Sequence, residues 1–380
     1  MHRERPTVHV LTNWRFIMKK LKKLTALLTA IGMVAAMSAC GSDAASSTTT
    51  ASTGAVDSAP AATEAAQAAE APAEAGSAAE TAAAGDETYL IGICQLVQHE
   101  ALDAATQGFK DALVETFGED GVEFDEQNAQ GDSNTCSTII NSFVSEGTDL
   151  ILANATAALQ AAQAGTSDIP VLGTSVTEYG VALGIDDFNG TVGNNISGTS
   201  DLAPLDEQAA MLQELFPDAK NVGLLYCTAE ANSQYQVDTV QAALEKLGYT
   251  CTQYGFSDSN DLSSVATTAA DASDVLYVPT DNTVANNTEL VNNICEPKKV
   301  PIIAGEEGIC SGCGVATLSI DYYDLGVATG KMAVQVLKGE ANISEMPIEY
   351  APQFTKEYDA DRCEALGITV PDDYVAIEAE

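Results

Sequence analysis

A strand-then-helix pattern runs twice along the chain, and this tandem repeat constrains the fold more than any other feature. The first pass starts at the apolar run YLIGICQ (89–95), and residues 101–118 then place apolar side chains at helical spacing. Its later strand-like runs are VEFDEQNA, DLILANA (149–155), IPVLGTS (169–175) and VALGI (181–185). Strands separated by helices of this length form βαβ units and predict a parallel sheet.

The second pass starts at NVGLLYC (221–227), which echoes the first strand. The helical stretch VDTVQAALEKLGY follows, and DVLYVP and VPIIAGEE continue the alternation. Between the two passes lies GNNISGTSDLAPLDEQ (193–208), whose Gly, Ser and Asn are typical of a linker. The sequence therefore predicts two similar α/β lobes in a body of about 290 residues, a length sufficient for both.

The N-terminus predicts export. Met18 opens MKKLKK, an apolar run follows, and small residues precede Cys40, as in a secretory signal. The cysteine at the cut predicts a bacterial lipoprotein signal over residues 1–39, with Met18 as the true start and lipid on Cys40. An uncleaved anchor helix is the alternative. Residues 40–87 contain no aromatic residue, Leu or Ile, so they are expected to form a disordered tether.

Charge excludes one class of partner. The chain carries 55 Asp and Glu against 16 Lys and Arg, a formal net charge of −39. Proteins that bind nucleic acid are basic, so a nucleic-acid partner is excluded. An electrostatic membrane patch is excluded for the same reason, which leaves the N-terminal lipid as the expected membrane contact.

Catalytic and metal motifs are missing from the sequence. It has no GxSxG, HExxH or Walker A pattern, and His99 is the one histidine after the tether. Cys310-Ser-Gly-Cys313 is the one CxxC, and a zinc site would need more ligands. We therefore expect no enzyme, metal or cofactor, with the CxxC either a disulfide or two idle thiols. His99 is expected at most to line a cleft.

Polar residues follow the strands, where ligands bind parallel α/β sheets. In VLYVPTDNTVANN (275–287), Asp281 follows a buried-looking strand, so it marks either a surface turn or a cleft. Because six strand ends share this pattern, the cleft is favoured. These ends comprise Gln95, Asn154 with Thr156, Thr174 with Ser175, Glu230 with Asn232 and Ser233, Asp281, and Glu306 with Glu307. For each hydroxyl or amide the alternative is a helix N-cap.

Several segments together resemble one known family. They are IGICQLVQHEALDAATQGF, NISGTSD, LYCTAEANSQYQ, YVPTDNTVANN and GVATLSIDYYDLGVATGKMAVQVLKGE. The chain resembles ABC-transporter substrate-binding lipoproteins of the tryptophan/tyrosine-binding type, over about 89–378. The resemblance implies a type I periplasmic-binding-protein fold, two Rossmann-like lobes with parallel sheets joined by a three-strand hinge.

The resemblance also places the lobes along the chain. It implies one lobe from residues 88–200 and 321–341, and another from 201–320 and 342–380. The crossovers are expected near Ser197–Leu205, Ile320–Tyr322 and Ala341–Glu345, and the last strand, IEYAPQF, is expected in the second lobe.

The implied ligand is a small amino acid, with an aromatic one favoured, delivered to an ABC permease and ATPase. Its carboxylate would meet hydroxyls and amides of the first lobe, Asn154, Thr156, Thr174 and Ser175. Its ammonium would meet a carboxylate, and the candidates are Asp281, Glu306, Glu307 and Asp321. One of the two adjacent glutamates, Glu306 or Glu307, is expected to lie in a solvated turn instead. Gln95, Glu230, Asn232 and Ser233 could serve the ligand's backbone or side chain. Candidate aromatic walls are Tyr179, Tyr226, Tyr322 and Tyr323.

The implied protein is a monomer, lipid-anchored on the outer face of the bacterial cytoplasmic membrane. Two other readings stay open. The cleft could take a nucleoside or a sugar, and the chain could be a ligand-sensing subunit rather than a transport component.

Overall fold

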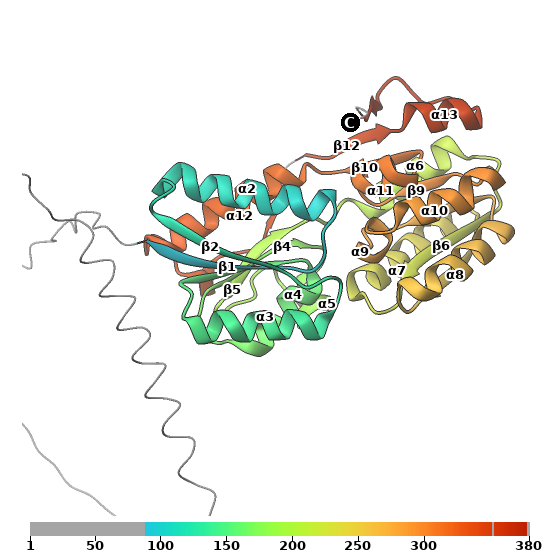
Figure 1. Ribbon diagram of the computed structural model, residues 1–380. Helices are drawn as coiled ribbons and strands as arrows, with labels where there is room; N and C mark the ends of the chain where they lie inside the picture. The colour runs from blue at the N-terminus through green and yellow to red at the C-terminus, as the bar shows by residue number, and fades with distance from the viewer. Residues whose placement is uncertain (1–87, 352, 378–380) are drawn as a thin grey trace, which may run out of the picture. The chain divides into compact units, whose positions relative to one another are not determined.

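The computed structural model describes residues 88–351 and 353–377, within one compact unit. This part of the chain forms two α/β lobes, each built on its own sheet (Figure 1). The expected signal segment (1–39), the lipidation site Cys40 and the tether (40–87) lie outside the described residues. Within 88–351 and 353–377, no helix is long and apolar enough to cross a membrane.

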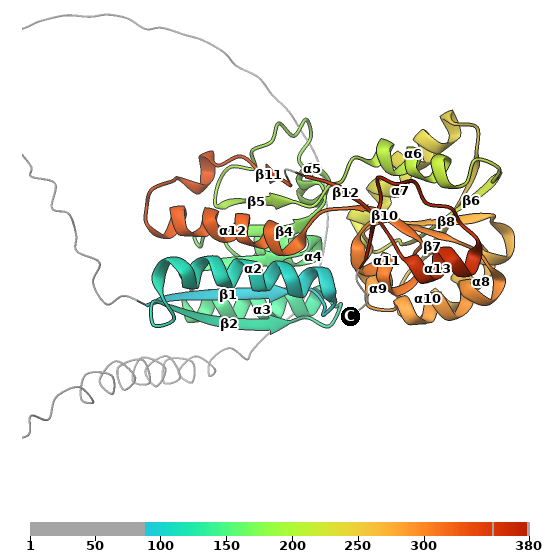
Figure 2. The same cartoon turned by 90° about the horizontal axis from the view of Figure 1, so that it is seen from above.

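The first lobe contains a parallel sheet of six strands in the order β11-β5-β4-β3-β1-β2. The strands are β1 (Tyr89–Gln95), β2 (Val122–Asn128), β3 (Leu150–Asn154), β4 (Val171–Val176), β5 (Ile196–Ser200) and β11 (Glu349–Tyr350). The helices are α2 (Glu100–Phe117), α3 (Ser133–Glu146), α4 (Thr156–Gly165), α5 (Tyr179–Leu183) and α12 (Tyr322–Leu337), with a 3-10 turn η2 (Ile343–Glu345). Helices α2 and α12 cover one face and α3 and α4 the other (Figures 1 and 2).

The second lobe contains seven strands in the order β13-β12-β10-β9-β8-β6-β7, parallel except where β10 meets β12. The strands are β6 (Asn221–Cys227), β7 (Thr250–Phe256), β8 (Val275–Val278), β9 (Ile302–Ala304), β10 (Ala316–Ser319), β12 (Thr355–Tyr358) and β13 (Val375–Ala376). The helices are α6 (Leu205–Leu215), α7 (Ala231–Lys246), α8 (Ser259–Ala272), α9 (Asn282–Ala285), α10 (Thr288–Cys295), α11 (Glu307–Cys313) and α13 (Ala360–Leu366), with a turn η1 (Glu296–Lys298).

The central strands of both sheets are buried on both faces. Every residue of β3, β4 and β8 is buried. Parallel strands covered on two sides read as continuous apolar runs rather than as alternating ones. The polar residues that end these runs therefore stand out in the sequence, and they mark the edge of the sheet where the cavity lies.

Glycines let α2 and α12 approach closely in the first lobe. A Cβ added to Gly108 would collide with the backbone of Tyr323, and one added to Gly326 would collide with the backbone of Ala105. This contact fixes the N-terminal turns of both helices side by side (Figure 2). It thereby positions His99, before α2, and Tyr322, at the start of α12.

Two segments differ from the sequence prediction. VALGI (181–185) falls largely in helix α5, and the expected linker 193–208 contains the buried strand β5. Strand β5 has the small and polar residues typical of a linker, so its sequence did not indicate a strand. The small residues are needed because other parts of the lobe lie close to the backbone here. A Cβ on Gly198, whose φ is 147°, would collide with Gly173 and with the hydroxyl of Tyr179.

The chain crosses between the lobes after β5, after β10 and after β11. The first two crossovers, at residues 201–204 and 320–321, lie where the sequence predicts them. The third lies between Tyr350 and Thr355 rather than near Ala341–Glu345, so that prediction is wrong. Turn η2 and strand β11 remain with the first lobe because β11 pairs in parallel with β5. The second-lobe strand is β12, and not IEYAPQF.

Candidate ligand-binding site

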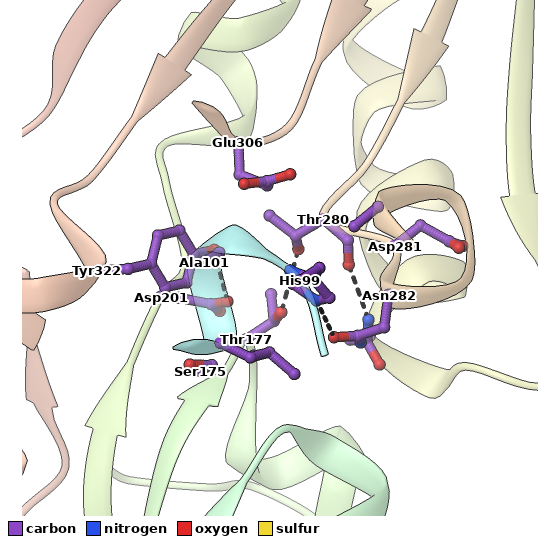
Figure 3. Close-up of a pocket in the computed structure, with 13 residues that line it drawn as sticks. His99, Ala101, Ser175, Thr177, Asp201, Thr280, Asp281, Asn282, Glu306 and Tyr322 are labelled. Carbon is purple, nitrogen blue, oxygen red and sulfur yellow. Dashed lines mark hydrogen bonds between the residues drawn. The ribbon is translucent and has the colours of Figure 1, made fainter. Parts of the chain in front are cut away.

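A cavity of about 290 Å³ lies where the carboxyl ends of the two sheets face each other (Figure 3). The first lobe lines it with His99, Ala101, Leu102, Ser175, Thr177, Asp201 and Tyr322, and the second with Asn232, Thr280, Asp281, Asn282, Ala285 and Glu306. This figure includes space open to solvent, and the part that a water-sized sphere can occupy is about 20 Å³. That is room for about one water molecule, so an amino acid fits only if the lobes or their side chains move apart.

Asp201 follows β5 and is 5 % exposed. Its Oδ2 accepts a hydrogen bond from the Tyr322 hydroxyl at 3.0 Å, while Oδ1 has no hydrogen-bond partner among the described residues. Burial raises the pKa of Asp201 to about 6, and hydrogen bonds from Tyr322 and Thr177 oppose that rise. The site therefore holds a carboxylate that is largely ionised at neutral pH, with one oxygen free to accept.

Ser175 lies near the end of β4, where the register between β4 and β5 shifts. Its φ is 53°, an unusual value for a residue other than glycine, and such strain is concentrated at functional sites. The side chain is buried and Oγ has no hydrogen-bond partner in the described part of the chain. The irregular backbone thus presents a free hydroxyl to the cavity.

His99 is the N-cap residue of α2, and its side chain makes no capping bond. The backbone N–H groups of the first turn of a helix have no partner within the helix, and Ala101 and Leu102 of this turn line the cavity. His99 Nε2 lies 3.2 Å from Asn282 Oδ1, whereas Nδ1 is buried with no partner within 88–351 and 353–377. Burial lowers the pKa of His99, so the ring is neutral at physiological pH.

Asp281 lines the cavity, but its carboxylate accepts hydrogen bonds from residues of its own lobe. Its Oδ2 accepts from the Cys227 N–H at 2.6 Å, and its Oδ1 caps α9 by accepting from the Val284 N–H at 2.9 Å. Figure 3 shows the carboxylate turned away from the centre of the cavity. Burial, and to a lesser extent the nearby charge of Glu230, raises the pKa of Asp281 to about 8.

Glu306 is likewise an N-cap. Its carboxylate accepts from the N–H groups of Gly308 at 2.8 Å and Ile309 at 2.5 Å, at the start of α11. Burial raises its pKa to about 7, and these two hydrogen bonds oppose the rise. The N-cap alternative is therefore found for both Asp281 and Glu306.

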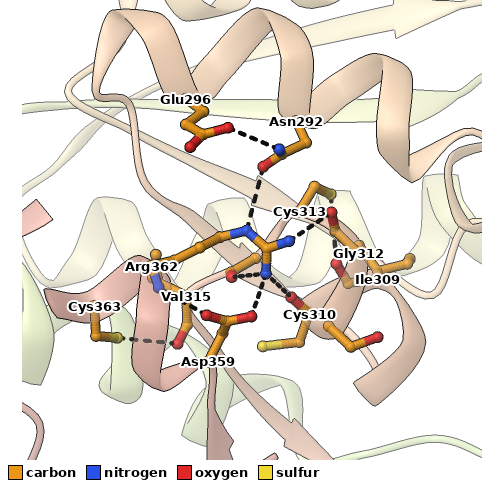
Figure 4. Close-up of polar contacts among 12 residues, drawn as sticks. Asn292, Glu296, Ile309, Cys310, Gly312, Cys313, Val315, Asp359, Arg362 and Cys363 are labelled. Atoms are coloured by element: carbon orange, nitrogen blue, oxygen red, sulfur yellow. Dashed lines mark hydrogen bonds and ion pairs between the residues drawn. The ribbon is translucent and has the colours of Figure 1, made fainter. Parts of the chain in front are cut away.

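The other end of α11 is held by Arg362 of α13 (Figure 4). Its guanidinium donates to the carbonyls of Cys310 at 3.2 Å, Gly312 at 2.8 Å and Gly314 at 3.4 Å, and it pairs with Asp359. A cation at a helix C-terminus is stabilising. The CxxC segment thus lies in a helix whose backbone is fixed at both ends, and its two buried cysteines are not joined by a disulfide.

Glu230 fixes the loop that follows β8. One of its oxygens accepts from the N–H and side-chain amide of Asn282, at 3.0 and 2.8 Å, and the other accepts from Thr283. Asn232 donates to the Thr280 carbonyl at 2.9 Å and lines the cavity. Glu230 itself lines a larger adjoining hollow of about 850 Å³, which shares Asn282 with the cavity.

Three predicted residues of the first lobe lie behind the cavity wall. Gln95 bonds Asp103 at 2.6 Å, and Asn154 donates to the Leu102 carbonyl at 2.9 Å, so both hold the start of α2. Thr174 is within 3.3 Å of Thr199 in a buried hydroxyl cluster. None of the three lines the cavity.

Other predicted residues also lie outside the lining. Thr156 begins α4, and Ser233 is in the first turn of α7. Asp321 is exposed and caps α12 by accepting from the Asp324 N–H. Of the tyrosines, Tyr179, Tyr226 and Tyr323 bond elsewhere, to the Thr199 carbonyl, to Gln234 and Gln253, and to Asp111.

The cavity lining thus includes five of the predicted ligand-binding residues, Ser175, Asn232, Asp281, Glu306 and Tyr322, and also His99, which was expected at most to line a cleft. Sequence reasoning missed Asp201, because it falls in the segment taken for a linker. The signal was available, since Asp201 directly follows the strand ISGTS, as the other polar residues follow theirs. Thr177 was also missed, and Thr280 and Asn282, which flank Asp281 in VLYVPTDNTVANN, were not named as candidates.

Direct contacts join the lobes across the cavity. Besides the pair His99 and Asn282, the hydroxyls of Thr177 and Thr280 lie 3.4 Å apart. Each pair takes one residue from each lobe. The cavity is therefore bounded by lobes that touch.

A family model for ABC transporter substrate binding proteins matches residues 90–380. This chain belongs to the ABC transporter substrate-binding protein family. It is 39% identical over 260 residues to the tyrosine-binding protein of Clostridioides difficile (strain R20291), which covers 68% of this chain and 75% of that protein. This is a family of binding proteins, so the expectation that the chain is not an enzyme is confirmed.

Solved structures show the same fold. The ABC domain in complex with L-Trp from Streptococcus pneumonia is 33% identical, with a TM-score of 0.72 over 75% of this chain and 97% of that one. The ligand-free, open structure of a substrate binding protein with adhesive properties from Clostridium difficile is 37% identical, with a TM-score of 0.60 over 77% of this chain and 100% of that one.

Of these two structures, the complex with L-Trp has the higher TM-score, although its sequence identity is lower. The type I periplasmic-binding-protein fold, predicted from the resemblance, is confirmed.

Proposed function

We propose that this substrate-binding protein takes a free aromatic amino acid and closes its lobes over it. The observation that carries the proposal is a set of three buried polar atoms without partners among the described residues, Asp201 Oδ1, Ser175 Oγ and His99 Nδ1. All three residues line one cavity. Buried polar groups are normally hydrogen-bonded, so a ligand that satisfies all three is implied.

The ammonium end of the ligand lies at Asp201. A buried carboxylate is costly unless it is paired, and an ammonium supplies both the opposite charge and the donors. The Tyr322 hydroxyl already occupies Oδ2 and holds the carboxylate in place, so Oδ1 takes the ligand. With its proton on Nε2, toward Asn282, His99 offers Nδ1 as a second acceptor.

The carboxylate end of the ligand lies at Ser175 and the first turn of α2. The free Ser175 hydroxyl is a donor, and the N–H groups of Ala101 and Leu102 add two more at the positive end of a helix of 18 residues. The absence of a side-chain cap from His99 leaves this helix end open to a ligand carboxylate.

The ligand's side chain is proposed to be aromatic on the strength of relatives. One is a tyrosine-binding protein and another is in complex with L-Trp. In this chain the apolar part of the lining comprises Ala101, Leu102, Ala285 and the ring of Tyr322. An aromatic ring buries more apolar area than other side chains, and offset stacking on Tyr322 adds to its affinity.

The sequence and the family support a proposal for the location and partners of the protein. We propose export, lipid attachment at Cys40, a position on the outer face of the cytoplasmic membrane, and delivery of the ligand by a monomer to an ABC permease with its ATPase. A Cys40→Ser variant expressed in the native host should lose incorporation of a labelled fatty acid. Equal labelling of both proteins would reject the anchor.

Isothermal titration of the full chain tests the ligand. L-Tyr, L-Trp and L-Phe should bind, and N-acetyl-tyrosine, which has no ammonium, should bind at least about 30-fold more weakly than L-Tyr. Leucine, adenosine and glucose serve as controls for the side chain and the ligand class. Binding of a sugar or nucleoside with no response to any amino acid would overturn the proposal.

A further inference from the structure

Two cysteines of the first lobe lie against each other in its core. Cys94 is on β1 and Cys136 is in the first turns of α3, and both are 0 % exposed. They belong to the same core cluster, in which α3 packs against the sheet. A Cβ added to Gly92, two residues before Cys94 in β1, would lie 2.6 Å from the ring of Phe143, which is two turns after Cys136 in α3. Cys94 shares its strand face with Gly92, and Cys136 shares its helix face with Phe143, so the two cysteines lie on facing surfaces of β1 and α3.

The other buried thiols with assigned partners point elsewhere. Cys313 Sγ lies 3.4 Å from the Ile309 carbonyl, Cys363 Sγ 3.4 Å from the Val315 carbonyl, and Cys227 Sγ 3.7 Å from the Ser257 carbonyl. These thiols donate to backbone oxygens. The pair Cys94 and Cys136 therefore differs from these three cysteines, whose thiols bond to backbone carbonyls.

The contact also makes the two thiols unequal. The hydrogen bond from Cys94 lowers the pKa of Cys136 and raises that of Cys94, and burial also raises both. Cys136 also lies near the N-terminus of α3, which favours a thiolate, while the carboxylate of Asp132, the N-cap of this helix, raises the pKa of Cys136. The net shift lowers the pKa of Cys136, so its thiolate is taken as the attacking group.

We propose that Cys94 and Cys136 form a disulfide that joins β1 to α3 when the chain folds in the presence of a disulfide oxidant. The Cys136 thiolate attacks the oxidant's disulfide, forms a mixed disulfide and releases one oxidant thiol. Cys94 then loses its proton and attacks Cys136 Sγ, which releases the second oxidant thiol. Two electrons pass from the two cysteines to the oxidant.

The bond would brace the part of the first lobe beside the cavity. Strand β1 leads into His99, and Ser133, one turn before Cys136, lines the larger hollow. The segment between the two cysteines contains α2 and β2, so closing this long loop restricts the unfolded chain.

Refolding of the full chain tests the pair. The denatured protein is refolded in a mixture of reduced and oxidised glutathione, unfolded again with N-ethylmaleimide, digested and examined by mass spectrometry. A peptide linking Cys94 to Cys136 is expected, with both cysteines of the CxxC segment alkylated as the matched control pair. Equal alkylation of Cys94 and Cys310, or pairing of Cys94 with any other cysteine, would overturn the proposal.

Thermal unfolding supplies a second readout. Reductant should lower the Tm of the oxidised wild type by at least about 5 °C. A Cys94→Ser, Cys136→Ser double variant should yield no linked peptide and show no effect of reductant on its Tm. A wild-type Tm that reductant does not change contradicts a structural disulfide, and this result does not depend on whether the variant folds.

Discussion

The Tyr322 hydroxyl donates to Asp201 Oδ2 at 3.0 Å and leaves Oδ1 as a buried acceptor with no partner among the described residues. The two residues are far apart in sequence, one at the first crossover and the other at the second. Since each sits where the chain passes between lobes, the pair links the proposed ammonium site to the hinge.

Asp201→Asn should weaken tyrosine binding by at least about 30-fold, because it removes one partner of a buried charge pair. Titration calorimetry of both proteins measures the change. Asp321→Asn is the matched control, because Asp321 was a candidate from the sequence, whereas Asp201 was not, yet Asp321 is exposed and does not line the cavity. If Asp321→Asn loses more affinity than Asp201→Asn, the proposed ammonium site is wrong.

Ser175→Ala should reduce tyrosine affinity by about 10-fold or more, since it removes one hydrogen bond to a charged carboxylate. Tyramine, which lacks the carboxylate, provides the control on the ligand side. The variant and the wild type should bind tyramine with equal affinity. A similar loss for tyrosine and tyramine would show that Ser175 acts on the shape of the cavity and not on the carboxylate.

The sequence predicted the two lobes and their parallel sheets because apolar strands and amphipathic helices alternate clearly. It could not distinguish a carboxylate that meets a ligand from one that caps a helix. Asp281, Glu306 and Asp321 all follow a strand and precede a helix, and each caps the helix that it precedes. Asp201 follows a strand with no helix immediately after it, and this context separates it from the other three only when β5 is recognised.

Ligand affinity should fall as the pH drops through 6. The pKa of Asp201 is raised to about 6, chiefly by burial, and an ammonium binds the ionised form. At pH 5 about a tenth of Asp201 would be ionised, so tyrosine should bind about 10-fold more weakly than at pH 7.5. Asp201→Asn should abolish this dependence. An unchanged affinity between pH 5 and 7.5 in the wild type would contradict the assignment.

The stability of the ligand-free protein should change in the opposite direction. Burial raises the pKa of Asp201 to about 6, of Glu306 to about 7 and of Asp281 to about 8 in the folded state. Between about pH 4 and 8 the folded chain therefore binds more protons than the unfolded one, and its stability is lost as the pH rises. Urea unfolding should give a higher midpoint at pH 5 than at pH 8. A midpoint that rises steadily over this range would contradict the raised pKa values.

Arg362→Met should destabilise the second lobe by about 2–3 kcal/mol. The guanidinium donates to three carbonyls at the end of α11 and pairs with Asp359, and hydrogen bonds that involve a charged group contribute about 1.5–3 kcal/mol. Arg362→Lys should recover part of the loss, because an ammonium cannot reach all of these acceptors at once. Urea unfolding measures both variants.

Lys356→Met is the control, since Lys356 pairs with Glu214 and Asp373 at the surface, where ion pairs contribute under about 1 kcal/mol. If Lys356→Met costs as much as Arg362→Met, the end of α11 is not what Arg362 stabilises.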